Sequence, residues 1–177
     1  MRTASHAAGE PLLPESLGDD FVGLGMRRWH REFPEVDCSG KAVIGRVLHL
    51  HDVILRRVER VLARHGLRYA SYAVLATLRV EGEPFQMSPT AILNSLILTS
   101  GGLSNLLRRM EQDGYITRTS DQRDGRGVVV ALTPRGRAVI EPAMRDHAAV
   151  ELQIIAKLST RQRRSVAEAL KTITGVR

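Results

Sequence analysis

The hydrophobic and polar positions between residues 101 and 112 follow a helical period. At 100° per residue, Leu103, Leu106, Leu107 and Met110 share one face. The opposite face carries hydroxyl, amide and guanidinium groups, which hydrogen-bond base edges in the major groove of DNA. The same pattern also fits a helix whose polar face only meets water. The candidate DNA contacts of this segment are Ser100, Gly101, Ser104, Asn105, Arg108 and Arg109.

A shorter helix is predicted directly upstream. Ser88 can cap it, Pro89 suits its first position, and it should end near residue 97. Thr99 then caps the next helix, which ends before Gly114. Two helices joined by a turn of about three or four residues predict a helix-turn-helix. Ser88 and Thr99 each precede a helix N-terminus and are candidate phosphate contacts, although Thr99 could serve only as a cap.

Two β-rich runs follow, at residues 115–119 and 128–132. The connection between them is too long for a tight hairpin, so it should protrude as a wing. Arg123 and Arg126 in this connection can meet phosphates or enter a minor groove, with Arg126 nearer the groove. Asp121 and Asp124 formally neutralise the loop, which argues against that role. We interpret them as partners that hold the arginines extended.

The N-terminal part should contain a flexible arm and two helices. Residues 1–17 show no helical or alternating period. The first helix should run from Asp19 or Asp20 to about Phe33, and the second from Lys41 to about His65. Both have an apolar stripe that must pack on something. The stripe of the first helix consists of Val22, Met26, Trp29 and Phe33.

The C-terminal part predicts two further helices. Thr133-Pro134 can start a helix that runs to about Lys157, and Ser159 with Gln162 forms a capping box for the last helix. Both have apolar faces with no further domain to cover them, so a second subunit should cover them. The expected division is a 1–17 arm, 18–67 N-terminal helices, a 68–133 winged lobe and 134–177 dimerisation helices. The expected fold class is mainly α with a small β wing (α+β).

Charge and composition restrict the class of protein. The 177 residues carry a formal net charge of +7, which favours a polyanionic partner. One cysteine excludes an intrachain disulfide and any cysteine-rich zinc module. No apolar run is as long as a membrane span, and the first fifteen residues lack the features of a signal peptide, so a cytoplasmic protein is expected. No catalytic constellation, metal site or cofactor motif is recognisable, which predicts a protein that is not an enzyme.

These motifs carry a resemblance to a known family. The helix-turn-helix, the wing pattern Asp-x-Arg-Asp-x-Arg-Gly at residues 121–127 and Leu-Thr-Pro-x-Gly at residues 132–136 resemble the MarR family of winged-helix transcription regulators. The resemblance covers residues from about 43 to 173. It implies a homodimer that binds a pseudopalindromic double-stranded DNA operator as a repressor and releases it when a small molecule binds or a cysteine is oxidised.

The resemblance also suggests a ligand pocket. The urate-responsive branch of the family has an added N-terminal helix with a tryptophan, which here corresponds to Trp29. This chain departs from that branch at Ala73, where an acid is expected, and at Leu106, where an arginine is expected. Trp29, His51 and Tyr72 are the candidate pocket walls, and the expected effector is a small aromatic or anionic molecule.

Two other functions fit the same sequence. An architectural DNA-binding protein without an effector would share the charge and the fold. A redox switch could act through Cys38, because a thiolate at a helix N-terminus is favoured by the helix dipole. Relatives that sense peroxide carry their cysteine inside the long helix, near the position of Val47 here.

Overall fold

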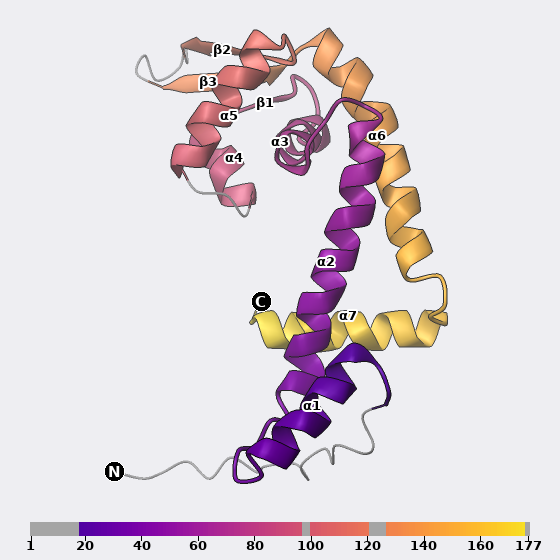
Figure 1. Cartoon of the computed structure of the whole chain (residues 1–177). Helices are drawn as coiled ribbons and strands as arrows, with labels where there is room; N and C mark the ends of the chain where they lie inside the picture. The colour runs from indigo at the N-terminus through magenta and orange to yellow at the C-terminus, as the bar shows by residue number, and fades with distance from the viewer. Residues whose placement is uncertain (1–17, 97–99, 121–126, 176–177) are drawn as a thin grey trace. The chain divides into compact units, whose positions relative to one another are not determined.

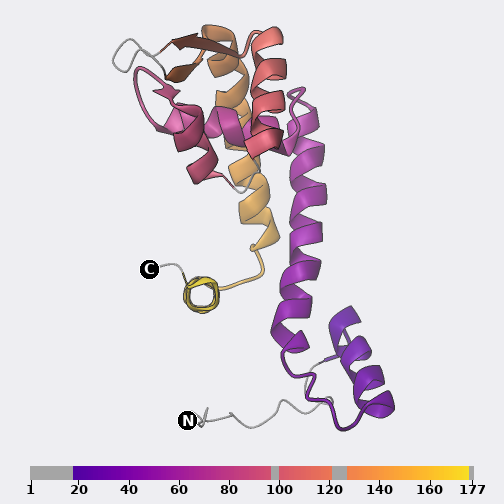
Figure 2. The same ribbon diagram turned by 90° about the vertical axis from the view of Figure 1, so that its left-hand side faces the viewer.

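The computed structural model describes residues 18–96, 100–120 and 127–175, with the side chains of residues 100 and 101 excepted. The described residues form two compact units, divided between Leu55 and Arg56, which we describe one at a time. The fold is helical with one small sheet, and Figures 1 and 2 show its elements. The expected mainly α fold with a β wing is therefore confirmed. No described helix has both the length and the apolarity to cross a membrane.

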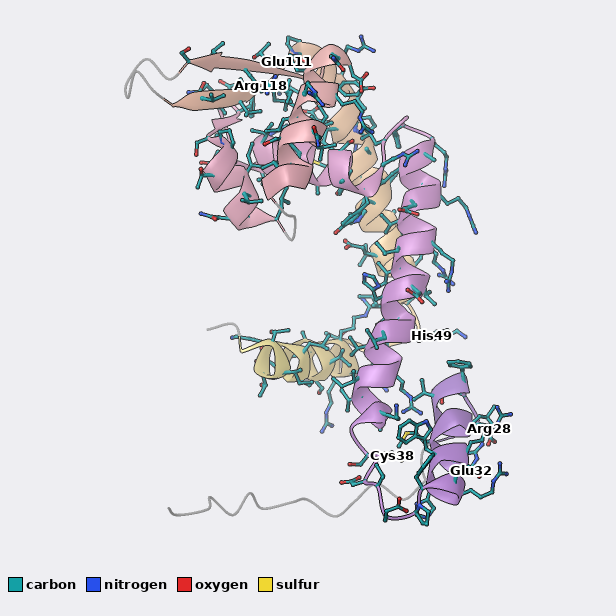
Figure 3. All side chains as sticks on the ribbon, turned by 60° about the vertical axis from the view of Figure 1, so that its left-hand side comes forward. Arg28, Glu32, Cys38, His49, Glu111 and Arg118 are labelled. Atoms are coloured by element: carbon teal, nitrogen blue, oxygen red, sulfur yellow. The ribbon has the colours of Figure 1, made fainter. Side chains whose placement is uncertain are left out.

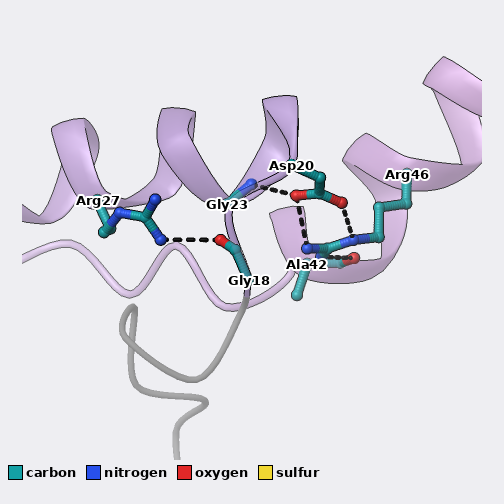
Figure 4. A network of polar contacts seen from close by, with 6 residues as sticks. All are labelled: Gly18, Asp20, Gly23, Arg27, Ala42 and Arg46. Carbon is teal, nitrogen blue, oxygen red and sulfur yellow. Dashed lines mark hydrogen bonds and ion pairs between the residues drawn. The ribbon is translucent and has the colours of Figure 1, made fainter.

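The first unit contains α1 (Phe21–Glu32) and the first part of α2 (Lys41–Ala63). Asp20 caps α1, as predicted, by accepting a hydrogen bond of 2.8 Å from the backbone N–H of Gly23. The same carboxylate accepts two bonds of 2.9 Å from the Arg46 guanidinium of α2 (Figure 4). The Gly23 bond, and then Arg46, lower the pKa of Asp20. A single carboxylate thus starts α1 and ties it to α2.

The apolar stripe of α1 is only partly buried. Met26 is 1% exposed, whereas Trp29 and Phe33 are 43% and 53% exposed. Within the described chain, the predicted packing stripe therefore buries Met26 and leaves these two aromatic side chains partly uncovered. Lys41, the first residue of α2, places its Nζ 4.2 Å from the centroid of the Trp29 ring.

The core of the second unit lies among the end of α2, α3 (Tyr69–Val80) and α6 (Pro134–Ile154). Tyr72 of α3 stacks on His147 of α6 with ring centroids 4.6 Å apart, and burial raises the pKa of the Tyr72 hydroxyl. His65, which follows α2, lies 2.8 Å from the carboxylate of Asp146. Apolar side chains fill the rest, among them Val58, Leu62, Val74, Leu75, Leu78, Ile140 and Ala143.

The winged lobe lies within this second unit. Its helices are α4 (Pro89–Ser95) and α5 (Ser100–Gln112), and its strands are β1 (Gln86–Met87), β2 (Ile116–Ser120) and β3 (Val128–Leu132). The sheet is antiparallel in the order β1-β3-β2, with Ile116 opposite Leu132 and Ser120 opposite Val128. The predicted helices and wing strands are thus confirmed within a few residues. The predicted cap Thr99 and the wing residues Arg123 and Arg126 lie outside the described residues.

Thr133 and Gly136 join the wing to α6. The Thr133 hydroxyl accepts a bond of 3.0 Å from the N–H of Gly136 and lies 2.7 Å from the carbonyl oxygen of Gly114, to which it can donate. The N–H of Thr133 donates to the carbonyl of Tyr115 at 3.0 Å. A Cβ added at Gly136 would overlap that carbonyl oxygen and lie 2.9 Å from Leu132 Cδ1. The Leu-Thr-Pro-x-Gly motif therefore encodes a helix cap followed by a close backbone crossing.

An ion-pair cluster connects α3, α6 and the segment before β1. Arg79 and Arg137 both bond Oε1 of Glu141, at 2.9 and 2.8 Å, and these bonds lower the pKa of Glu141, Arg137 contributing most. Each guanidinium also lies 5.1 Å from the centroid of the Phe85 ring. The ring is held by cation–π contacts at the point where the chain enters the sheet.

The last helix, α7 (Thr160–Thr174), has the predicted capping box. Ser159 accepts from the N–H of Gln162, and the Gln162 side chain accepts from the N–H of Ser159. No residue of α7 is buried, and Val166, Leu170 and Ile173 are 45%, 36% and 54% exposed. The described part of this chain thus leaves the apolar face of α7 uncovered.

Candidate nucleic-acid interface and effector cavity

Helix α5 separates its apolar and polar residues as the sequence predicts. Leu103, Leu107 and Met110 are buried, with exposures of at most 3%. Ser104, Asn105, Arg108 and Arg109 are exposed on the other side. Arg108 donates a bond of 2.9 Å from Nη2 to Oδ1 of Asn105. An amide and two guanidinium groups therefore stand together on a solvent-facing helical surface, which is the chemistry that reads guanine and adenine in a major groove.

A salt bridge ties α5 to the neighbouring strand. The Glu111 carboxylate accepts bonds from Nε and Nη2 of Arg118 at 2.9 and 2.6 Å, and from the backbone N–H of Arg118 at 3.1 Å (Figure 3). These bonds, the side-chain pair foremost, lower the pKa of Glu111. Glu111 is on α5 and Arg118 on β2, so the pair fixes the helix relative to the wing strand. Because the two residues belong to different elements and are seven positions apart, no helical or strand pattern in the sequence marks the pair.

The pair makes stability depend on pH in a predictable direction. The pKa of Glu111 is lowered in the folded protein from its ordinary value of 4.5, so the pair contributes stability above that value and loses it as pH falls through the folded pKa. We expect Glu111→Gln to melt below the wild type by a constant amount from pH 7 to pH 5. The difference should shrink at more acidic pH. Melting curves between pH 3 and pH 7 measure it, and a difference that grew on acidification would contradict this assignment.

The other predicted DNA contacts lie at helix starts or outside the described chain. Ser88 is the N-cap of α4, and its Oγ accepts a bond of 3.2 Å from the N–H of Ala91. Its side chain is exposed, so it could also meet a phosphate. Ser100 and Gly101 form the first turn of α5. Thr99, Arg123 and Arg126 are not among the described residues, and their roles stay predictions.

The first unit contains a cavity of about 560 Å³ between α1 and α2, a volume typical of small-molecule sites. Its wall is mostly apolar and includes Trp29, a predicted pocket residue. His49 also lines it, whereas the predicted His51 does not and instead lies 3.6 Å from Asp52. Polar groups enter from Arg28, Lys41 and Asp52; the remaining walls are Phe21, Val22, Leu24, Gly25, Met26, Gly45 and Leu48.

The remaining candidate residues lie elsewhere. Tyr72, the third predicted pocket residue, is 9% exposed in the core of the second unit, where it stacks on His147. Cys38 is half-buried, and its carbonyl accepts from the N–H of Lys41 at 2.9 Å, directly before α2 (Figure 3). Within the described ranges, no three His, Cys, Asp or Glu side chains form a group that could hold a metal ion.

Two successive helices, α4 and α5, of which α5 buries its apolar face and packs against a three-stranded antiparallel sheet, define a winged helix-turn-helix protein. Residues 65–127 match the MarR family. The chain is 30% identical to the transcriptional regulator PecS of Dickeya dadantii, with 78% of this chain and 83% of PecS covered. The chain therefore belongs to the MarR family of DNA-binding transcriptional regulators.

Solved structures share this fold. A mutant of MarR from E. coli, complexed with operator DNA, superimposes with a TM-score of 0.66 at 21% identity, covering 82% of this chain and 96% of that one. BpsR of Bordetella bronchiseptica, whose DNA binding is regulated by 6-hydroxynicotinic acid, gives a TM-score of 0.67 at 19% identity, covering 76% and 94%.

Proposed function

We propose that the protein is a homodimeric repressor that binds a pseudopalindromic operator and releases it when a small aromatic or anionic ligand binds. The observation that carries the DNA-binding part is the exposed surface of Ser104, Asn105, Arg108 and Arg109 on α5, which Glu111–Arg118 holds against β2. In this proposal the residues that contact base edges in the major groove are Ser100, Gly101, Ser104, Asn105 and Arg108. Arg109, Ser88 and Thr99 contact the backbone, and Arg123 and Arg126 extend from the wing. The structure of a MarR relative with operator DNA supports this role.

The test of this function is a titration of the purified protein on DNA upstream of its own gene, with sequence-scrambled competitor. A specific regulator should bind its operator with an affinity about 10³-fold or more higher than its affinity for the scrambled competitor. If scrambled DNA displaced the protein from its operator as well as unlabelled operator DNA does, the proposal would be rejected and an architectural DNA-binding protein supported.

The wing residue Arg126 provides a second check. Arg126→Ala should weaken binding to operator DNA and to random DNA to a similar degree. It should also reduce the slope of log K against log salt by about one, because one phosphate contact is lost. Fluorescence anisotropy across a salt series measures the slope. Arg56→Ala, which removes an exposed arginine of α2, is the matched control and should leave the slope unchanged. An unchanged slope for Arg126→Ala would remove it from the phosphate contacts.

Dimerisation is supported by uncovered apolar surface on α2 and on the last helix. On α2, Ile44, Val47 and Leu48 are between 38% and 63% exposed, and the apolar face of α7 is also open. Extended apolar surfaces of this kind mark subunit interfaces. We expect Leu170→Glu with Ile173→Glu to shift the protein from dimer to monomer in sedimentation equilibrium and to weaken operator binding. Lys171→Glu changes charge on the opposite side of α7 and should leave the dimer intact.

The α1–α2 cavity is the site that we propose for the effector. It combines the Trp29 ring with Lys41 and Arg28, which suit a flat molecule with a negative charge. The regulation of BpsR by 6-hydroxynicotinic acid gives a precedent for the ligand class within this fold. Trp29 also supplies the readout, because a ligand stacked beside it should change its fluorescence. A panel of aromatic carboxylates, tested for fluorescence change and for operator release, examines both parts of the proposal.

A further inference from the structure

A second hollow, of about 450 Å³, lies in the second unit between the end of α2 and α6. Arg57, Arg60 and Arg64 line its α2 side. They are spaced three and four residues apart, so their side chains follow one row of the helix surface. Along α6 the wall is formed by Asp146, Ala149, Val150 and Gln153, which share one helical face in the same way.

The charges of this hollow are not balanced. Its wall has three guanidinium groups and one carboxylate, Asp146, which already lies 2.8 Å from His65. Among the residues that the structure describes, none forms an ion pair with Arg57, Arg60 or Arg64. Like charges three and four residues apart repel each other on a helix. The helix dipole favours the cations nearest the end of α2, but it does not balance a row of three.

The hollow is also built as a binding surface rather than as a flat helix face. The His65–Asp146 contact joins the two segments at one end of the hollow. Val61 and Val150, which are 5% and 9% exposed, form an apolar floor beneath the guanidinium groups. The amide of Gln153 adds a neutral donor on the opposite wall. Guanidinium groups pair with carboxylate and phosphate oxygens through two parallel hydrogen bonds, so three of them suit a ligand with several such oxygens.

We propose that this arginine hollow binds a small anion that carries two or more carboxylate or phosphate groups. The site is separate from the α1–α2 cavity, which shares none of its residues. Binding here does not depend on the proposed operator function and is measured without DNA.

The experiment is calorimetric titration of the full chain with citrate and with pyrophosphate, at ionic strength held constant with sodium chloride. We expect one binding event per chain, with acetate, a monovalent anion, about tenfold weaker or more. The preferred probe tells carboxylate ligands from phosphate ligands. Each probe should also raise the melting temperature, because it binds only the folded chain.

The triple variant Arg57→Gln, Arg60→Gln and Arg64→Gln should lose affinity by about tenfold or more, since each charge-assisted bond contributes that much. The matched control removes three other exposed arginines, Arg56→Gln, Arg161→Gln and Arg164→Gln, and should keep the affinity within about twofold. If the triple variant fails to fold by circular dichroism, Arg60→Gln alone replaces it. Absence of binding by both probes, equal binding of acetate, or an equal loss in both triple variants would each overturn the proposal.

Discussion

Gly136→Ala should lower the free energy of unfolding by about 1–3 kcal/mol, because a methyl group at this position overlaps backbone that cannot move aside. The obstacle is the carbonyl oxygen of Tyr115, which already accepts the N–H of Thr133 at 3.0 Å. For a chain of this length the loss corresponds to a fall in melting temperature of about 3–10 °C. Thermal unfolding followed by circular dichroism at constant protein concentration gives the value.

Gly25→Ala is the control for this prediction. Gly25 lies inside α1, and a Cβ there meets no atom within 4 Å. Alanine has the higher helix propensity, so the control should keep or slightly raise the stability. If Gly136→Ala melted within 1 °C of the wild type, about the error of the measurement, the close crossing between α6 and the wing would not hold in solution.

Arg108→Ala should weaken operator binding by about 1–3 kcal/mol, or about 5- to 150-fold, with a much smaller effect on random DNA. The reason is that a bidentate guanidinium contact to guanine distinguishes one base pair from the others. The free protein holds this guanidinium beside the Asn105 amide at 2.9 Å, so the two groups should act on neighbouring bases. Anisotropy titrations with operators changed at single positions would show relaxed preference at one base pair of each half-site.

Arg56→Ala removes the same charge from an exposed site outside the lobe and serves again as the control. This substitution should lower the affinity for operator DNA and for random DNA only slightly and by the same factor. An equal loss on operator and random DNA for Arg108→Ala would show that Arg108 contacts phosphate and does not read bases.

Local sequence signals predicted the helix starts correctly. Asp20, Ser88, Thr133 and Ser159 each accept a hydrogen bond from a backbone N–H in the first turn that follows. Such caps depend only on the next three residues, so they can be identified without the tertiary structure. The buried face of α5 was predicted for a similar reason, since the helical period alone brings Leu103, Leu107 and Met110 together.

Features that depend on two distant segments cannot be predicted from local patterns in the sequence. Trp29 and Phe33 share the apolar stripe of α1 with Met26 but are 43% and 53% exposed, and the extent of their burial depends on contacts with other segments, which no pattern within α1 specifies. His49 lines the cavity and His51 does not, because residues two positions apart on a helix point to different sides, and only the packing of α1 decides which side of α2 faces the cavity. The Glu111–Arg118 pair requires the strand to leave α5 at one particular angle. Arg57, Arg60 and Arg64 line a hollow only because α6, which is distant in the sequence, supplies its opposite wall.

The Glu111–Arg118 pair also limits the length of DNA that one subunit can read. It holds α5 and β2, the strand that leads to the wing, at one separation, so the distance between the two DNA-contacting parts of a lobe is fixed. Base pairs inserted within a half-site should therefore not be tolerated. Base pairs inserted between two half-sites change only the separation and the rotation between lobes. If the proposed dimer binds two half-sites, differences in length among its operators should therefore fall in the spacer between them.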